Sequence, residues 1–325
     1  PLSKSMEETK TDSLSPESRY YYFTEAQLHR KTGNYDKAIQ YLNKAIETDP
    51  ESTYLRLELA TLYLLIKDKQ GALNIVERII EKEPENLNAL IMYGRLKQGV
   101  NQVDDAQAVY EKIIAMDPKQ EDIYLLLGGL YIQEGKLDRA LKIYGQLVQN
   151  FPESYAGHFF IAKIFKEQNN TMGAEKEFKK TLEMNPDLEE PRYELISLYE
   201  AMGKEKKVIQ LYQELLKKNS QNIRAAMELG SYYHERGMTQ AAEKIFKDLG
   251  ERSIAQREVI RKVVTLYLNT KEYDAAAFIL EGMLKGAPDS SELHYLTGIV
   301  FDGKEDKDAA IRNYKKVVPD SRFYK

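Results

Sequence analysis

Apolar residues recur along most of the chain at intervals of three and four, the spacing of one face of an α-helix. In the middle of the chain this pattern runs through Tyr124, Leu127 and Tyr131, breaks at Gly135 and resumes from Leu137. No segment alternates with a period of two over a useful length, so no strands are predicted. The sequence therefore predicts an all-α protein built from pairs of amphipathic helices.

The helix pairs follow a period of 34 residues. A proline recurs six times at this step and once more after a gap of three steps, at Pro16, Pro50, Pro84, Pro118, Pro152, Pro186 and Pro288. A second ladder keeps the same step with one misfit among nine positions, at Ala38, Ala72, Ala106, Ala140, Ala174, Val208, Ala242, Ala276 and Ala310. Two ladders in one register indicate a repeat protein, and a period near 34 is typical of helix-turn-helix arrays.

Start and stop signals stand at fixed places in the repeat. In clusters such as Pro50-Glu51-Ser52, the proline ends one helix and the serine caps the next. Several repeats have a glycine between their two helices, at Gly33, Gly135, Gly203 and Gly237. We expect these glycines to end the first helix in the left-handed conformation.

The unit that begins at Glu121 resembles the motif of the tetratricopeptide repeat family. The matching residues are Tyr124, Leu127, Gly128, Tyr131, Gly135, Ala140, Tyr144 and Pro152. The resemblance divides residues 16–320 into nine repeats that start near Arg19, Thr53, Leu87, Glu121, Tyr155, Glu189, Ile223, Arg257 and Ser291. It implies a right-handed α-solenoid, a superhelix of stacked helix pairs, and it favours a bacterial source.

Glycine or alanine stands at the eighth and twentieth positions of most repeats, where small residues let the two helices approach closely. The sixth repeat departs from this pattern with Ile196 and Val208, and Ser220 replaces its proline; Ile254 and Val264 are further departures. Larger side chains at a crossing push helices apart. We therefore predict a change of superhelical curvature around residues 190–265, with ordinary variation of the motif as the alternative.

The two ends of the chain lie outside complete repeats. Residues 1–15 are polar and predict a flexible leader. Residues 319–324 repeat the pattern of residues 16–21, so residues 321–325 are interpreted as the start of a truncated tenth repeat. Four apolar residues of the last helix are expected to lack a cover: Ile311, Tyr314, Val317 and Val318. Missing sequence or a homodimer through this end would cover them.

Composition narrows the classes of function. The chain has 47 basic and 51 acidic side chains and a net charge of −4, a balance that indicates neither a nucleic-acid nor a membrane-surface partner. It has no cysteine, so disulfides and thiolate sites are excluded. No apolar run is long enough to span a bilayer. Localisation stays open between the cytoplasm and a bacterial periplasm or envelope.

Catalytic and metal-binding constellations are not found. The four histidines, His29, His158, His234 and His294, belong to different repeats and have no partner at ligand spacing. His158 and His294 occupy a packing position, which predicts buried or half-buried side chains. The sequence has no phosphate loop, nucleophile elbow or zinc-protease motif. We therefore expect no enzyme activity and no cofactor.

The resemblance also implies a binding surface. In tetratricopeptide arrays the first helix of each repeat lines the concave face, and its second, fifth, ninth, twelfth and thirteenth residues look inward; we call these the inward positions. At the fifth position the first seven repeats form an apolar stripe, Phe23, Leu57, Ile91, Leu125, Phe159, Tyr193 and Met227. Charged residues flank it at Arg95, Lys163, Lys166 and Arg224. Apolar residues on an open face indicate an interaction site, and packing on neighbouring helices is the competing interpretation.

We expect a non-catalytic scaffold that binds a protein or peptide segment in its concave groove. The chaperone-binding carboxylate clamp of some relatives needs lysine and asparagine where the first repeat has Phe23 and Gln27, so that function is not expected. One alternative is an assembly or anchoring module of the bacterial cell envelope, of lipoprotein type. Another is a regulatory subunit of an enzyme whose catalytic domain lies outside this sequence.

Overall fold

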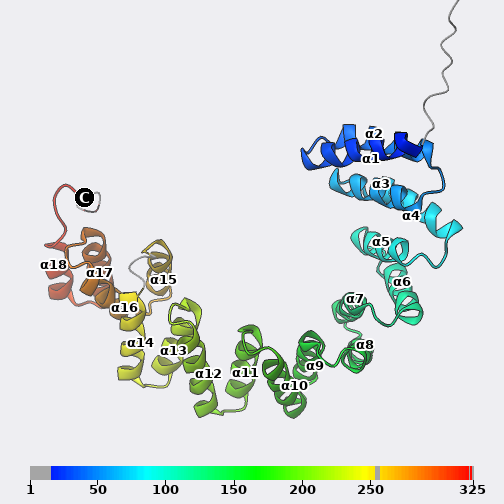
Figure 1. Ribbon diagram of the computed structural model, residues 1–325. Coiled ribbons are helices and arrows are strands. Elements are labelled where there is room, and N and C mark those ends of the chain that lie inside the picture. Colours follow the sequence, from blue (N-terminus) through cyan, green and yellow to red (C-terminus); the bar gives the residue numbers. More distant parts are fainter. Residues whose placement is uncertain (1–15, 253–256, 322, 324–325) are drawn as a thin grey trace, which may run out of the picture. The chain divides into compact units, whose positions relative to one another are not determined.

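The computed structural model describes residues 16–252, 257–321 and 323. The described residues form α-helices joined by short turns, and none of them lies in a strand (Figure 1). The predicted all-α class is therefore confirmed. The expected leader, residues 1–15, lies outside the described residues, as does most of the expected tenth repeat.

The chain divides into two compact units, Pro1–Met184 (unit 1) and Asn185–Lys325 (unit 2). Unit 1 contains the helix pairs α1 (Pro16–Lys31) and α2 (Tyr35–Thr48), α3 (Thr53–Leu65) and α4 (Lys69–Lys82), α5 (Leu87–Gly99) and α6 (Val103–Met116), α7 (Glu121–Gln133) and α8 (Leu137–Asn150), and α9 (Tyr155–Glu167) and α10 (Thr171–Met184). Unit 2 contains α11 (Glu190–Ala201) and α12 (Glu205–Lys218), α13 (Ile223–Glu235) and α14 (Thr239–Arg252), α15 (Arg257–Asn269) and α16 (Tyr273–Gly286), and α17 (Ser291–Gly303) and α18 (Lys307–Tyr314).

The turn inside each pair has a residue with positive φ at one fixed place in the repeat. The glycines predicted there, Gly33, Gly135, Gly203 and Gly237, have φ between 65° and 76°. The same place in the other pairs is held by Lys67, Asn101, Asn169, Lys271 and Glu305, with φ between 58° and 63°. The repeat register therefore imposes the left-handed conformation even on side chains that disfavour it.

Several helix starts follow the predicted capping chemistry, whereas others, such as that of α7, have no side-chain cap. Ser52 Oγ accepts a hydrogen bond from the Leu55 backbone N–H at 3.4 Å, and Ser290 caps α17 in the same way through Leu293. Asn86 caps α5 with its side-chain oxygen 3.0 Å from the Ala89 nitrogen. These caps satisfy backbone donors that a helix start leaves unpaired.

Glycines at the eighth position face large aromatic residues of the same repeat. A Cβ on Gly94 would lie 2.5 Å from the ring of Tyr110, and one on Gly128 would lie 2.4 Å from the ring of Tyr144. The two helices of these repeats therefore approach at a distance that only glycine allows. In the sixth repeat, Ile196 is 2% exposed and Val208 is fully buried, so both are core residues of unit 2. The curvature change around residues 190–265 stays a prediction.

Two buried tyrosines at equivalent positions differ in their hydroxyl partners. Burial raises the pKa of Tyr110 to about 12, and its hydroxyl lies 3.3 Å from Gln98 Oε1. Burial also raises the pKa of Tyr144, whose ring stacks on Phe160 with 5.0 Å between the centroids. The Tyr144 hydroxyl is buried with no hydrogen-bond partner among the described residues.

We expect Tyr144→Phe to raise the free energy of unfolding by about 1 kcal/mol, because a buried unpaired hydroxyl costs about 1–3 kcal/mol. Tyr110→Phe is the matched control and should lower it by about 1 kcal/mol, since it breaks a hydrogen bond. Urea unfolding followed by circular dichroism measures both variants. Equal losses in the two would contradict the description of the Tyr144 hydroxyl.

Two second helices of successive repeats, α14 and α16, pack backbone against backbone. A Cβ on Gly250 would lie 2.1 Å from the carbonyl oxygen of Ile279, and one on Gly282 would lie 2.1 Å from that of Lys247. Lys247 also pairs with Glu281 of α16 at 2.9 Å. Glycine on both helices is therefore a requirement of this contact.

The C-terminal helix is covered more than the sequence predicts. Ile311 and Val318 are 50% and 54% exposed, as expected, but Val317 is only 4% exposed. Tyr314 is half-buried and packs on Tyr295, with 6.1 Å between ring centroids. The expectation for Val317 and Tyr314 is wrong because α18 ends at Tyr314, after which the chain turns back and the Val318 N–H bonds Ser291 Oγ at 3.1 Å.

Candidate binding groove

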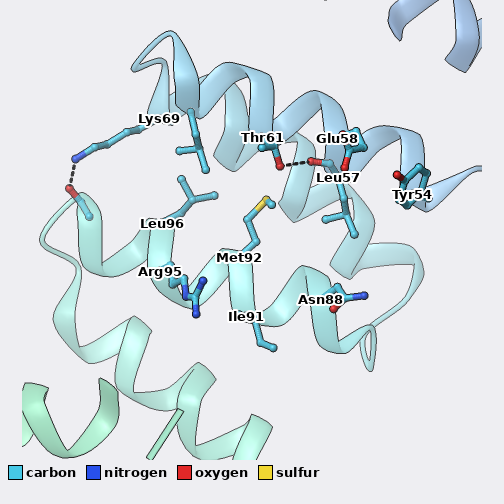
Figure 2. A pocket seen from close by; sticks show the side chains of 12 residues that line it. Tyr54, Leu57, Glu58, Thr61, Lys69, Asn88, Ile91, Met92, Arg95 and Leu96 are labelled. Carbon is cyan, nitrogen blue, oxygen red and sulfur yellow. Dashed lines mark hydrogen bonds between the residues drawn. The ribbon is translucent and has the colours of Figure 1, made fainter. Parts of the chain in front are cut away.

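The first helices of the second and third repeats, α3 and α5, form most of the lining of an open cavity of about 500 Å³ in unit 1 (Figure 2). Leu57 extends from α3, and Met92 and Leu96 extend from α5, into the space between the helices (Figure 2). The full lining is Tyr54, Leu57, Glu58, Thr61, Leu64, Lys69, Asn88, Ile91, Met92, Arg95, Leu96 and Gly99. We call this cavity the α3–α5 pocket.

Helical spacing brings these residues to one face of each helix. On α3 the residues Leu57, Thr61 and Leu64 are four and three apart, and on α5 Ile91 and Arg95 are four apart. Eight of the lining residues stand at inward positions: Tyr54, Leu57, Thr61, Leu64, Asn88, Ile91, Arg95 and Gly99. The structure thus brings together three residues predicted for the groove, Leu57, Ile91 and Arg95.

The charged groups of the α3–α5 pocket differ in their partners. Glu58 accepts hydrogen bonds from Gln27 at 2.9 Å and from Arg30 at 3.1 Å. Lys69 donates to the carbonyl oxygen of Gly99 at 2.6 Å, near the C-terminal end of α5. Arg95 is exposed and makes no hydrogen bond or ion pair with any residue that the structure describes. The pocket therefore presents one uncommitted cation beside an apolar floor.

The rest of the stripe in unit 1 is half-buried. Phe23 lies 5.7 Å from Tyr54, measured between ring centroids, and Leu125 packs at the edge of the core. Phe159 contacts Phe178 with 6.0 Å between centroids, and the Lys163 ammonium lies 5.5 Å from the centroid of Phe159. These side chains both pack on neighbouring helices and leave part of their surface accessible. Lys166 is likewise half-buried.

Two of the three predicted residues of unit 2, Tyr193 and Arg224, contact one another. Tyr193 is only 8% exposed, and its hydroxyl donates to Asn222 Oδ1 at 3.2 Å. The Arg224 guanidinium lies 3.8 Å from the centroid of the Tyr193 ring and its Nε donates to Glu228 at 2.8 Å. Met227 is half-buried. At Tyr193 the stripe position therefore serves mainly packing.

Several pocket residues were missed at the sequence level. Met92 and Leu96 directly follow the inward positions of Ile91 and Arg95, and both are apolar. This apolar character next to an inward position is the signal in the sequence that could have identified them as pocket residues. Tyr54 is 59% exposed and, like Asn88, stands at the second position of its helix. Lys69 gave no signal, because it belongs to the second helix of its repeat and reaches α5 through a backbone carbonyl.

Two histidines at packing positions are engaged with neighbouring groups. His158 is half-buried with Nδ1 2.6 Å from Glu177, and His294 is buried with Nε2 2.7 Å from the Pro288 carbonyl oxygen, as predicted for packing positions. Across the described ranges, no three His, Cys, Asp or Glu side chains are grouped to hold a metal ion. None of the helices described is long and apolar enough to cross a membrane.

Comparisons with known proteins concern the repeat and the fold. The sequence model of the tetratricopeptide repeat family matches residues 29–96, 67–128 and 96–164. No curated protein matches the chain. The structure of pilF from Pseudomonas aeruginosa is 15% identical, with a TM-score of 0.50, and the match covers 67% of this chain and 98% of that one.

Two further solved structures are less similar in shape. A MamA protein is 22% identical with a TM-score of 0.47, over 53% of this chain and 94% of that one. YrrB, described as a repeat protein of the same family with an unusual peptide-binding site, is 18% identical with a TM-score of 0.43, over 51% and 86%. At these identities the likeness concerns the fold alone.

Proposed function

Because the chain belongs to the tetratricopeptide repeat family, whose stacked helix pairs serve as scaffolds, we propose that its concave groove in unit 1 binds a segment of another protein. The α3–α5 pocket receives an apolar side chain of that segment. The partially accessible residues Leu125 and Phe159 extend the contact along α7 and α9.

One observation carries this proposal: an apolar cavity opens at the positions where the repeat register places inward-facing residues. Its volume of about 500 Å³ lies within the range of about 300–1,000 Å³ that ligand pockets occupy. The walls come from Leu57, Ile91 and Met92, which are half-buried in the free protein. An inserted apolar group would remove their remaining surface from water, which favours binding.

The shape of the surface favours a chain-like partner over a small molecule. The stripe continues beyond the pocket from Ile91 to Leu125 and Phe159, each on the first helix of the next repeat. A partner that follows this row spans several helices, as peptides do when apolar anchors occupy a groove. The pocket supplies the main anchor, because buried apolar anchors dominate the affinity of such interfaces.

We expect Asn88→Trp to weaken binding of apolar peptides about tenfold or more, because the indole would fill the pocket mouth. Asn88 is exposed and makes no hydrogen bond within the described part of the chain, so its replacement removes no contact of the fold. The matched control is Asn43→Trp, the same change at an exposed residue of α2. Binding is measured by fluorescence anisotropy with labelled 12-residue peptides that each contain three leucines.

The two tryptophan variants separate the outcomes. Peptide binding that survives in Asn43→Trp and falls in Asn88→Trp supports the groove. Equal binding by both variants would place the contact on another surface, and an absence of binding by every leucine-containing peptide would overturn the proposal. Circular dichroism and thermal melting verify that both variants stay folded.

A further inference from the structure

The charges at the inward positions have opposite signs in the two units. In unit 1 these positions hold five cations and two anions: Arg30, Lys31, Arg95, Lys163, Lys166, Asp122 and Glu167. In unit 2 they hold two cations and six anions: Arg224, Arg261, Glu190, Glu200, Glu235, Glu258, Glu292 and Asp302. The inward positions of unit 1 are thus basic in a chain whose net charge is −4.

Arg95 is the cation of unit 1 best placed to meet a ligand. Arg30 is already paired with Glu58 at 3.1 Å, and Lys69 is bonded to a backbone carbonyl. Arg95 lies on the rim of the α3–α5 pocket, is exposed, and has no ion-pair partner among the described side chains. A guanidinium offers a planar fork of donors that matches a carboxylate in two parallel hydrogen bonds.

The groove floor next to Arg95 is open. On α7 the position equivalent to Arg95 is Gly129, which is exposed. A Cβ built on Gly129 would have no heavy atom within 4 Å. On α9 the equivalent residue is Lys163, also exposed. The ninth positions of three successive first helices therefore hold a cation on α5, a glycine without a side chain on α7 and a second cation on α9.

A row of apolar residues runs beside this basic row. Ile91, Leu125 and Phe159 stand four residues before Arg95, Gly129 and Lys163, one helical turn away on the same face of α5, α7 and α9. The two rows present apolar contacts and positive charge in parallel. Complementary charge selects a partner and speeds its encounter more than it adds to apolar affinity.

Building on the proposed function, we propose that the partner segment of unit 1 is acidic: its apolar side chain occupies the α3–α5 pocket, its carboxylates pair with Arg95 and Lys163, and its backbone crosses α7 over Gly129.

The test uses three fluorescein-labelled 12-residue peptides with the same three leucines. Four further positions are all aspartate, all asparagine or all lysine, and the rest are serine. We expect the full-length protein to bind the aspartate peptide about tenfold more tightly than the asparagine peptide at low salt, since a charge-assisted contact has about this effect. The lysine peptide should bind most weakly. Salt should reduce the preference, because exposed charges are screened.

Variants of Arg95 test whether this residue causes the preference for the aspartate peptide. Arg95→Gln should reduce the affinity for the aspartate peptide several-fold and that for the asparagine peptide much less. Arg95→Glu should shift the preference toward the lysine peptide. Lys142→Gln, which removes the same charge from an exposed position on α8, is the control and should change neither affinity.

The outcomes distinguish this inference from the proposed function. Equal affinities for the aspartate and asparagine peptides, both weakened by Asn88→Trp, would overturn the acidic partner and leave the groove intact. A charge preference unaffected by Arg95→Gln or equally affected by Lys142→Gln would also overturn it. If none of the peptides binds, the proposed function fails and the acidic partner fails with it.

Discussion

Gly250→Ala is expected to lower the free energy of unfolding by about 3 kcal/mol, the upper end of the usual cost of overpacking. The added methyl group would lie 2.1 Å from the carbonyl oxygen of Ile279, so the backbones of α14 and α16 have to separate. Separation also weakens the ion pair between Lys247 and Glu281. The damage should concentrate in unit 2, because repeats contact mainly their neighbours.

Urea unfolding followed by circular dichroism measures the loss, and hydrogen exchange locates it. Gly145→Ala on α8 is the control, because a Cβ there has no heavy atom within 4 Å and alanine favours a helix over glycine by about 1 kcal/mol. A Gly250→Ala protein as stable as the Gly145→Ala protein would refute the close packing of α14 and α16.

Two adjacent glycines of α7 should respond in opposite ways to substitution. Gly128→Ala is expected to cost about 1–3 kcal/mol, because its Cβ would lie 2.4 Å from the ring of Tyr144. That ring is fully buried and stacked on Phe160, so it has no room to yield. Gly129→Ala should instead stabilise the protein by about 0.5–1 kcal/mol, since it improves helix propensity on an open surface.

A larger substitution at Gly129 tests binding without disturbing the fold. Gly129→Tyr should stay folded, because the side chain enters empty space, and should weaken binding of the aspartate–leucine peptide about tenfold by obstructing the groove. Thermal melting and anisotropy are measured on the same samples. A Gly129→Tyr protein that binds like the wild type would show that the ligand does not cross α7 at this point.

The repeat architecture could be predicted from the sequence because each signal recurs. The proline and alanine ladders gave the register, and the register in turn placed Leu57, Ile91 and Arg95 on one surface. Lys67 and Glu305 adopt a positive φ with no local signal, since neither residue favours it. Their conformation follows from their place in the repeat, which local propensity does not reveal.

Features that belong to a single repeat could not be predicted. Gly250 and Gly282 stand at different positions of their repeats, so they do not belong to a series that recurs every 34 residues. Both nevertheless lie at the contact between α14 and α16. The burial of Tyr193 depends on Asn222, which caps α13, and on Arg224 of α13 in the following repeat. The cover over Val317 depends on where α18 ends. Each of these features is set by tertiary contacts at one place in the chain, and a pattern that repeats along the sequence does not reveal such contacts.

We propose that the groove of unit 1, lined by first helices, is the binding surface. Photocrosslinking tests it most directly, with a photoreactive phenylalanine analogue placed either at Asn88 on the rim of the α3–α5 pocket or at Asn43 on α2. The probe is the aspartate–leucine peptide. We expect a crosslink to the peptide from position 88 and none from position 43; a crosslink from position 43 alone, or from neither, would refute binding in this groove.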